Sequence, residues 1–266
     1  MIHKANEIMF SVITVCLNPG EDLKHTVDSV VSQSYKNWEL VIKDGGSTDG
    51  CLEKITKDEN IKVIEKKDSG IYSAMNQGVE LSKGKYIIFM NAGDTFAGES
   101  VLEDVAQFVN ENKNADVVYG DYINSRAELC KLPSNITKSF LYRTFLCHQA
   151  VFYNSEIMNF YDESFRLLAD HDLNIKLINE GKIFLKIAIP VCKYKGGGVS
   201  EKAENLKIHT EEFEKIRKRY FTKKEILIFK VKRMLTFPAL RKLMYSSSSP
   251  ASLRKLYRFV VTRVRK

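Results

Sequence analysis

The 266-residue sequence contains no long apolar run. No stretch approaches the roughly 18 apolar residues that a membrane-spanning helix needs. The N-terminal residues, MIHKANEIMFSVITV, have neither a charged leader before a long apolar stretch nor a small-residue cleavage site, so we expect no signal peptide. A hydrophobic content of 44% and a charged content of 28% are those of an ordinary soluble protein with enough chain to build a core.

Cysteine is scarce and shows no metal-binding pattern. No two cysteines form a CxxC pair, and none has the spacing of zinc ligands. The five are scattered along the chain, at positions 16, 51, 130, 147 and 192. This pattern predicts reduced thiols in a cytosolic protein.

Acidic residues are nearly absent from the C-terminal part of the chain. Residues 215–266 hold 17 Lys and Arg against one acid, Glu225, although the net charge of the whole chain is only +8. Residues 1–214 are therefore acidic on balance. This asymmetry predicts that the C-terminal segment binds a polyanionic surface.

Strand and helix patterns alternate in the first half of the sequence. Apolar, β-branched runs predict strands at 10–18, 38–44, 61–65 and 86–90. Amphipathic spacing predicts helices at 22–34, 51–58 and 71–84. Repeated strand–helix units predict an α/β fold, with a mostly parallel sheet flanked by helices on both sides.

Polar clusters follow each of these predicted strands. They lie at residues 18–20, 44–47, 67–69 and 91–94. Open α/β sheets bind ligands beyond the carboxyl ends of their strands. We therefore expect the four loops to converge on one edge of the sheet and to form the functional site.

The second half is less regular. Further strands are predicted at 115–123, 128–132, 148–154 and 183–191, and a helix at 170–182. Helical patterns run from about 201 to 245, followed by a SSSSP linker at 246–250 and a last basic helix. We expect one domain over residues 1–200 and a basic helical extension over residues 201–266.

Four stretches resemble the family 2 glycosyltransferases: FSVITVCLN, VIKDGGSTDG, DSGIYSAMNQGVELSKGKYIIFMNAGDTF and ADHDLNIKL. They have the order and spacing of the family's motifs and cover about residues 8–200. The resemblance implies the GT-A fold, which is Rossmann-like. It also implies transfer of a sugar from a nucleotide-sugar donor, UDP-linked in our expectation, to an acceptor hydroxyl, with inversion at the anomeric carbon.

The resemblance further implies which residues bind the donor. Thr14, Asn18 and Asp44 match the positions that hold the base, and Asp68 and Asn76 match a loop that lines the donor site.

The same residues also permit a purely structural interpretation. The glycines after Asp44 fit a turn, with Ser47 or Asp49 as a helix cap. Asp68 or Ser69 fits a cap of the helix that begins near residue 71.

Residues 91–94 stand where family members commonly carry a DxD-type motif, whose carboxylates bind Mg²⁺ or Mn²⁺ against the diphosphate. Here Asn91 replaces one acid, and Gly93 lies where another often sits. Asp94 remains, and an amide oxygen can also ligate a hard cation. We therefore expect a weakened Mg²⁺ or Mn²⁺ site at Asp94, with Asn91 beside the donor.

The stretch ADHDLNIKL matches the region that supplies the family's catalytic base. An inverting transfer needs a carboxylate beside the acceptor hydroxyl. In the predicted helix the apolar side chains lie on the side of Asp170 and away from Asp172. We predict that Asp170 faces inward as the base and that Asp172 faces solvent. An N-cap role for Asp170 is the alternative.

His148 and Gln149 resemble a pair found near the acceptor side of the family's cleft, and Asp172 is a further acceptor-side candidate. A structural role for His148 is equally compatible with its position. The glycines at 196–198 fit a lid that closes on the diphosphate, or a plain connector.

The tail at 215–266 mixes apolar and basic residues, as segments bound to anionic membrane surfaces do. A solvated basic helix pair and nucleic-acid binding are the alternatives, and the acidic remainder of the chain argues against nucleic acid. We expect a peripheral enzyme on the inner face of the cytoplasmic membrane. It would use a lipid-linked or saccharide acceptor in cell-surface polysaccharide biosynthesis.

Two rival functions remain at this point. One is a non-catalytic relative that lost activity together with its second acid. The other is a sugar-phosphate nucleotidyltransferase, which would need a Gly-rich phosphate loop with Arg or Lys after the first strand. The sequence CLNPGEDLK at 16–24 lacks such a loop.

Overall fold

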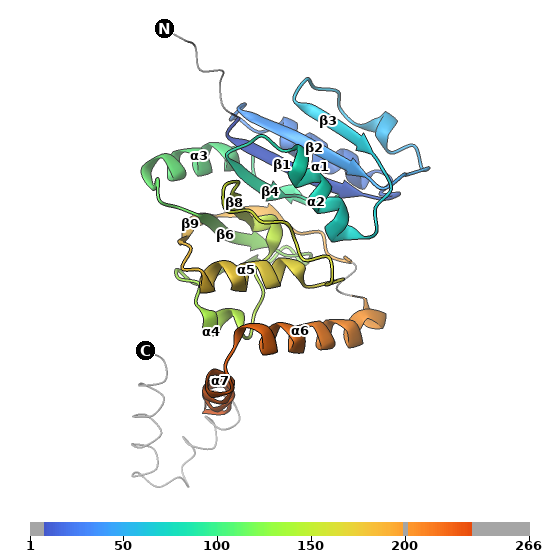
Figure 1. Ribbon diagram of the computed structural model, residues 1–266. Helices are drawn as coiled ribbons and strands as arrows, with labels where there is room; N and C mark the ends of the chain where they lie inside the picture. The colour runs from blue at the N-terminus through green and yellow to red at the C-terminus, as the bar shows by residue number, and fades with distance from the viewer. Residues whose placement is uncertain (1–7, 199–201, 236–266) are drawn as a thin grey trace. The chain divides into compact units, whose positions relative to one another are not determined.

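A computed structural model describes residues 8–198 and 202–235, with side chains up to residue 230 (Figure 1). The chain divides into two units, 1–213 and 214–266. The first unit thus extends past residue 200, the boundary expected from the sequence. The linker at 246–250 and the last basic helix predicted from the sequence lie outside the described residues.

Within the described residues nine strands form one sheet, in the order β3-β2-β1-β4-β8-β6-β9-β5, with β7 paired to β6. Their bounds are β1 Phe10–Cys16, β2 Trp38–Asp44, β3 Ile61–Glu65, β4 Tyr86–Phe89, β5 Thr95–Phe96, β6 Val117–Ile123, β7 Leu129–Cys130, β8 Val151–Asn154 and β9 Phe184–Lys193. The first four strands are parallel, as predicted. Beyond β4 the sheet is mixed, because β8 runs antiparallel to both β4 and β6 while β6 and β9 are parallel.

The α-helices are α1 Asp22–Val31, α2 Ile71–Leu81, α3 Val101–Glu111, α4 Lys138–Leu141, α5 Ala169–Asn179, α6 Leu206–Tyr220 and α7 Lys223–Leu235. Helices predicted near 22, 71 and 170 are confirmed. The helix predicted at 51–58 is only a 3₁₀ turn, η1 Leu52–Lys54. Helix α3 was not predicted, although its buried residues Val101, Val105 and Val109 have helical spacing.

Helices cover both faces of the sheet. Strand side chains alternate between the faces: Val12 belongs to the core that includes α1 and α3, while Ile13 faces α2. The close approach of α2 depends on Gly78, because a Cβ there would lie 2.5 Å from Ile13 Cγ2. Helix α5 lies on the same face as α2, where Tyr153 of β8 donates to Asn174 (Figure 1).

Parallel register brings the polar loops to one edge, as predicted. Cys16, Asp44 and Glu65 are aligned at the carboxyl ends of β1, β2 and β3. The loops are joined by hydrogen bonds, from the Gly45 N–H to the carbonyl of Cys16 (2.9 Å) and from the Thr48 N–H to Asn18 Oδ1 (2.8 Å). The loop after β4 joins α1 through the Gly93 N–H, which donates to the carbonyl of Asp22 (3.2 Å).

In the second unit, the described residues of α7 expose Leu227 and Ile228 among lysines. Over the ranges that the structure describes, none of the helices has the length and apolar character that crossing a membrane requires.

Candidate functional site

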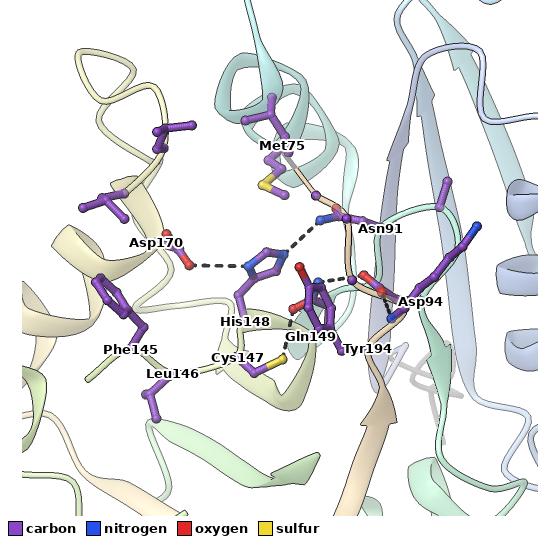
Figure 2. A pocket seen from close by; sticks show the side chains of 18 of the residues that line it. Met75, Asn91, Asp94, Phe145, Leu146, Cys147, His148, Gln149, Asp170 and Tyr194 are labelled. Atoms are coloured by element: carbon purple, nitrogen blue, oxygen red, sulfur yellow. Dashed lines mark hydrogen bonds and ion pairs between the residues drawn. The ribbon is translucent and has the colours of Figure 1, made fainter. Parts of the chain in front are cut away.

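A cavity of about 710 Å³ lies within the first unit. Its walls come from the loop after β4, the 3₁₀ turn η2 (His148–Ala150), the start of α5, and the loop after β9. Five residues predicted from the sequence line it: Asn91, Asp94, His148, Gln149 and Asp170. Figure 2 shows Asp170 and Asp94 on opposite sides, with His148 and Gln149 between them.

Asp94 is a buried carboxylate, and each of its two oxygens accepts one hydrogen bond. Only 4% of the residue is exposed. Its Oδ2 accepts a hydrogen bond from Gln149 Nε2 (2.7 Å), and its Oδ1 accepts one from the Lys195 backbone N–H (2.9 Å). Burial raises the pKa of Asp94, although both hydrogen bonds act against this shift. Asp94 therefore ties the β4 loop to η2 and to the loop after β9.

Asp170 is an ionised carboxylate held by two side chains. Its Oδ2 lies 3.4 Å from His148 Nδ1, and its Oδ1 lies 2.8 Å from the Tyr72 hydroxyl. Burial opposes ionisation of Asp170, but the contacts with His148 and Tyr72 outweigh it and lower its pKa below the ordinary value. Burial and the Asp170 charge raise the pKa of Tyr72 far above its usual range, so the hydroxyl keeps its proton.

His148 connects the two sides of the cavity. Its Nε2 lies 3.0 Å from Asn91 Nδ2 (Figure 2). The tautomer that satisfies both neighbours carries its proton on Nδ1, which faces Asp170, and accepts at Nε2 from the Asn91 amide. The sequence pointed to His148 and Asn91 separately, and the structure places them in contact.

The prediction that Asp172 faces solvent is wrong, because only 5% of the residue is exposed. Helix α5 is buried on more than one side. Helix α4 packs against it, and Phe213 of α6 stacks on His171 with ring centroids 5.6 Å apart. The helical pattern correctly turned Asp170 inward but could not show that a second layer covers the other side. The N-cap of α5 is Leu168, so Asp170 is not the cap.

The residues predicted to bind the base lie outside the cavity. Thr14 is fully buried within β1. Asp44 accepts hydrogen bonds from the N–H groups of Gly46 (2.8 Å) and Ser47 (2.7 Å), which close a tight turn. Burial would raise the pKa of Asp44, but these bonds and the Ser47 hydroxyl lower it. Asn18 is exposed and has a positive φ of 49°.

Asp68 is held by a buried cation that sequence reasoning missed. Lys43 of β2 is fully buried, and its ammonium group lies 2.8 Å from Asp68 Oδ2, 3.0 Å from the carbonyl of Asp44 and 2.5 Å from that of Lys66. The signal available in the sequence was a lysine within the predicted strand at 38–44, because lysine is rarely found in a buried strand. The N-cap of α2 is Gly70, without a side-chain cap. The capping role considered for Asp68 and Ser69 is thus not observed.

Asn76 is occupied by contacts within the protein. Its Oδ1 accepts from the Tyr161 N–H (2.8 Å), and its Nδ2 donates to the Tyr161 carbonyl (3.0 Å) and to Glu163 Oε1 (2.9 Å). Asn76 therefore fixes the chain segment that leads toward Asp170. Any effect of Asn76 on a donor would be exerted through this segment.

Few side chains of the site could ligate a divalent cation. In the part of the chain that the structure describes, no three His, Cys, Asp or Glu side chains are grouped to hold a metal. Asp94 supplies one carboxylate, and Asn91 has a buried Oδ1 without a hydrogen-bond partner. Mg²⁺ sites commonly combine one or two carboxylates with phosphate oxygens and water. With one carboxylate and one amide oxygen, the residues present fit a Mg²⁺ site that has few protein ligands.

Comparisons with known proteins agree on one family. The family described as "Glycosyl transferase family 2" matches residues 11–165. A "PGL/p-HBAD biosynthesis glycosyltransferase" of Mycobacterium tuberculosis is 32% identical over 202 residues, which are 72% of this chain and 79% of that protein. "Glycosyltransferase GlyG" of Streptococcus pneumoniae is 33% identical over 121 residues, which are 44% of this chain and 40% of that protein.

Solved structures show the same fold at low sequence identity. S. aureus TarS in complex with UDP-GlcNAc is similar with a TM-score of 0.63 and 15% identity, over 96% of this chain and 80% of that one. A mannosyltransferase from Pyrobaculum calidifontis in complex with GDP-Man and Mn²⁺ has a TM-score of 0.57 and 14% identity, over 95% and 68% of the two chains.

The buried Lys43 generates a stability prediction. In Lys43→Met, the partners of the ammonium group lose their hydrogen bonds while packing volume is kept. We expect the free energy of unfolding to fall by about 1–3 kcal/mol in a urea titration. Lys67→Met, an exposed change in the same loop region, should alter it by less than about 0.5 kcal/mol. Equal stability of the two variants would show that Lys43 does not hold these loops together.

Proposed function

Because the chain belongs to glycosyl transferase family 2 and is a glycosyltransferase with the GT-A fold, we propose that it transfers a sugar with inversion. The donor is a nucleoside-diphosphate sugar, with UDP as the nucleotide. The acceptor is a hydroxyl group of a lipid-linked or saccharide molecule.

The observation that carries this proposal is the separation of two different carboxylates across one cavity. Asp170 is ionised and contacts Tyr72 and His148. Asp94 is buried, and each of its oxygens accepts a hydrogen bond. An inverting displacement needs its base and its leaving group on opposite sides of the sugar. The positions of Asp170 and Asp94 in Figure 2 match that requirement.

In this mechanism Asp170 accepts the proton of the acceptor hydroxyl. The hydroxyl oxygen attacks the anomeric carbon as the bond from that carbon to the phosphate oxygen breaks, and the nucleoside diphosphate leaves with the bonding electrons. The lowered pKa of Asp170 keeps it unprotonated at neutral pH. Tyr72 and His148 fix its orientation, and positioning of this kind reduces the entropic cost of the reaction.

Donor binding is assigned to the edge where the first three strands end. Asn18, Asp44 and Asp68 lie in loops that hydrogen bonds join to one another. The family resemblance assigns the base to Thr14, Asn18 and Asp44, and the nucleotide sugar to Asp68 with Asn76 in an orienting role. The resemblance assigns His148, Gln149 and Asp172 to the acceptor side. His148, which contacts Asp170, supports this assignment, whereas Gln149 is bonded to Asp94 and Asp172 is buried.

Asp94 and Asn91 are the residues that would hold Mg²⁺ or Mn²⁺. When bound, the cation would offset negative charge on the departing diphosphate. The mannosyltransferase neighbour was solved with Mn²⁺, which supports this assignment.

The process is assigned to cell-surface polysaccharide biosynthesis. The relatives from Mycobacterium are named for PGL/p-HBAD biosynthesis, and the TarS neighbour was solved with UDP-GlcNAc. These names support a surface-glycan acceptor and a UDP-linked donor for this chain.

Two variants on one helix test the role of Asp170. A thermal-shift screen of UDP-, GDP- and TDP-sugars first identifies the donor, since a bound ligand stabilises by mass action. In Asp170→Asn we expect transfer to fall about 10²- to 10⁴-fold while the donor-induced shift is kept. Glu180→Gln, an exposed change at the other end of α5, should transfer normally.

The outcomes of these assays separate the alternatives. Full transfer by Asp170→Asn would exclude Asp170 as the base. Donor binding by the native chain without transfer to any acceptor would favour the non-catalytic relative. A stable chain that binds no nucleotide sugar would overturn the proposed function.

The contact between His148 and Asp170 predicts a pH effect. His148→Leu removes the contact that most lowers the pKa of Asp170, so that pKa should rise toward its ordinary value. Since the base acts only when ionised, the acid limb of the pH–rate profile should move to higher pH. His148→Gln, which keeps an amide donor, should move it less. An unmoved limb in His148→Leu would show that His148 does not tune Asp170.

Residues 215–266 are assigned to the surface of an anionic membrane, on the inner face of the cytoplasmic membrane. The described part of α7 supports this with exposed Leu227 and Ile228 beside lysines. The full chain should sediment with phosphatidylglycerol vesicles, and about 0.5 M salt should release it, because such binding is screened. Equal binding to phosphatidylcholine vesicles, or none to either, would contradict the assignment.

A further inference from the structure

The position of the missing second acid is covered by a lysine. Gly93 has a positive φ of 101°, and a Cβ built there would lie 2.9 Å from Lys195 Cδ and 3.4 Å from Asp22 Oδ2. A side chain at position 93 would have to adopt a backbone conformation that L-residues rarely take, and the Lys195 side chain would have to move aside. Lys195 thus lies beside Gly93, the position at which the family resemblance places a second acid.

The ammonium group of Lys195 is held by an exposed partner. It lies 2.6 Å from both carboxylate oxygens of Asp22, the first residue of α1. The Lys195 side chain is 54% exposed and that of Asp22 is 33% exposed. Ion pairs as exposed as this one contribute little to stability, so a more highly charged anion can take the place of Asp22.

The backbone of Lys195 is fixed more firmly than its side chain. Its N–H donates to the buried Asp94 (2.9 Å), and β9 ends two residues earlier, at Lys193. Glycines 196–198 follow directly and also line the cavity. The side chain is thus anchored at the cavity wall while its charged end remains exchangeable.

Charge in the cavity points to the same residue. The carboxylates lining it are Asp22, Asp94 and Asp170, and a nucleoside diphosphate would add further negative charge. Among the described residues that line the cavity, the Lys and Arg side chains are Lys195 and Arg166. Arg166 precedes α5, on the side of Asp170, whereas Lys195 is bonded to Asp94.

We propose that Lys195 binds the diphosphate of the donor, exchanging Asp22 for the phosphate oxygens and supplying positive charge where the second acid of a metal site is missing. This inference rests on the proposed function, because it names a phosphate-binding residue of the same site. Asp22 holds the ammonium group in place until the donor arrives. Transfer of the ammonium group from Asp22 to the phosphate requires rotation of the Lys195 side chain, while the hydrogen bond from the Lys195 N–H to Asp94 is kept.

The test is a set of binding measurements by calorimetry on the full chain. UDP and GDP are each compared with their monophosphate and their nucleoside, in EDTA and again with Mn²⁺. A charge-assisted hydrogen bond to phosphate corresponds to about 10- to 100-fold in affinity. We expect Lys195→Met to weaken diphosphate binding by about this factor in EDTA, and to leave nucleoside binding unchanged. The backbone bond to Asp94 is kept in this variant.

Two further variants make the result specific. Lys195→Arg keeps the positive charge and should retain most of the diphosphate affinity. Lys193→Met removes another exposed lysine, the last residue of β9, and should bind like the native chain. Thermal melting of each variant confirms that it is folded.

The outcomes separate a failure of the proposed role of Lys195 from a failure of the proposed function. If the native chain binds diphosphates and Lys195→Met binds them equally well, the role of Lys195 is wrong and the proposed function stands. Equal loss of nucleoside and diphosphate affinity in Lys195→Met would mean a structural role and would also overturn the inference. If the native chain binds no nucleoside diphosphate, the proposed function fails and this inference fails with it.

Discussion

The buried carboxylate of Asp94 is the constraint on which the site depends. A charge that is almost inaccessible to water is costly unless hydrogen bonds satisfy it. Gln149 and the Lys195 backbone N–H supply those bonds from segments 55 and 101 residues away. Three loops with no local connection are thereby held together. These three segments contribute part of the cavity wall.

The rest of the site is organised as a chain of contacts from that anchor toward α5. Asn91, two residues past the end of β4, meets His148, and His148 meets Asp170, which Tyr72 holds from α2. Burial dominates at Asp94 and raises its pKa, whereas at Asp170 the hydrogen bonds with His148 and Tyr72 outweigh burial and lower the pKa. Environment, and not residue type, separates the two carboxylates into an anchor and a proposed base.

Much of this arrangement was predictable from local sequence. The four parallel strands and their polar ends follow from apolar runs broken by Gly, Asn and Asp, and these ends include Asn91 and Asp94. Asp170 was predicted from the resemblance of ADHDLNIKL and from helical periodicity. Lys43 was missed because a lysine in an apolar strand has no meaning until its partners, Asp68 and two carbonyls, are placed around it. The burial of Asp172 was missed because periodicity along α5 says nothing about other elements that pack on this helix, such as α4 and Phe213 of α6.

The sequence by itself determined the family, the positions of the first four strands and the polar residues at their ends. The family follows from motifs, and the strands follow from local patterns of apolar and polar residues. Only the tertiary structure decided that Gln149 bonds Asp94, that His148 lies between Asn91 and Asp170, and that Lys195 covers Gly93. Those contacts join residues far apart in the chain. Their existence depends on how β4, η2, α5 and the loop after β9 pack together.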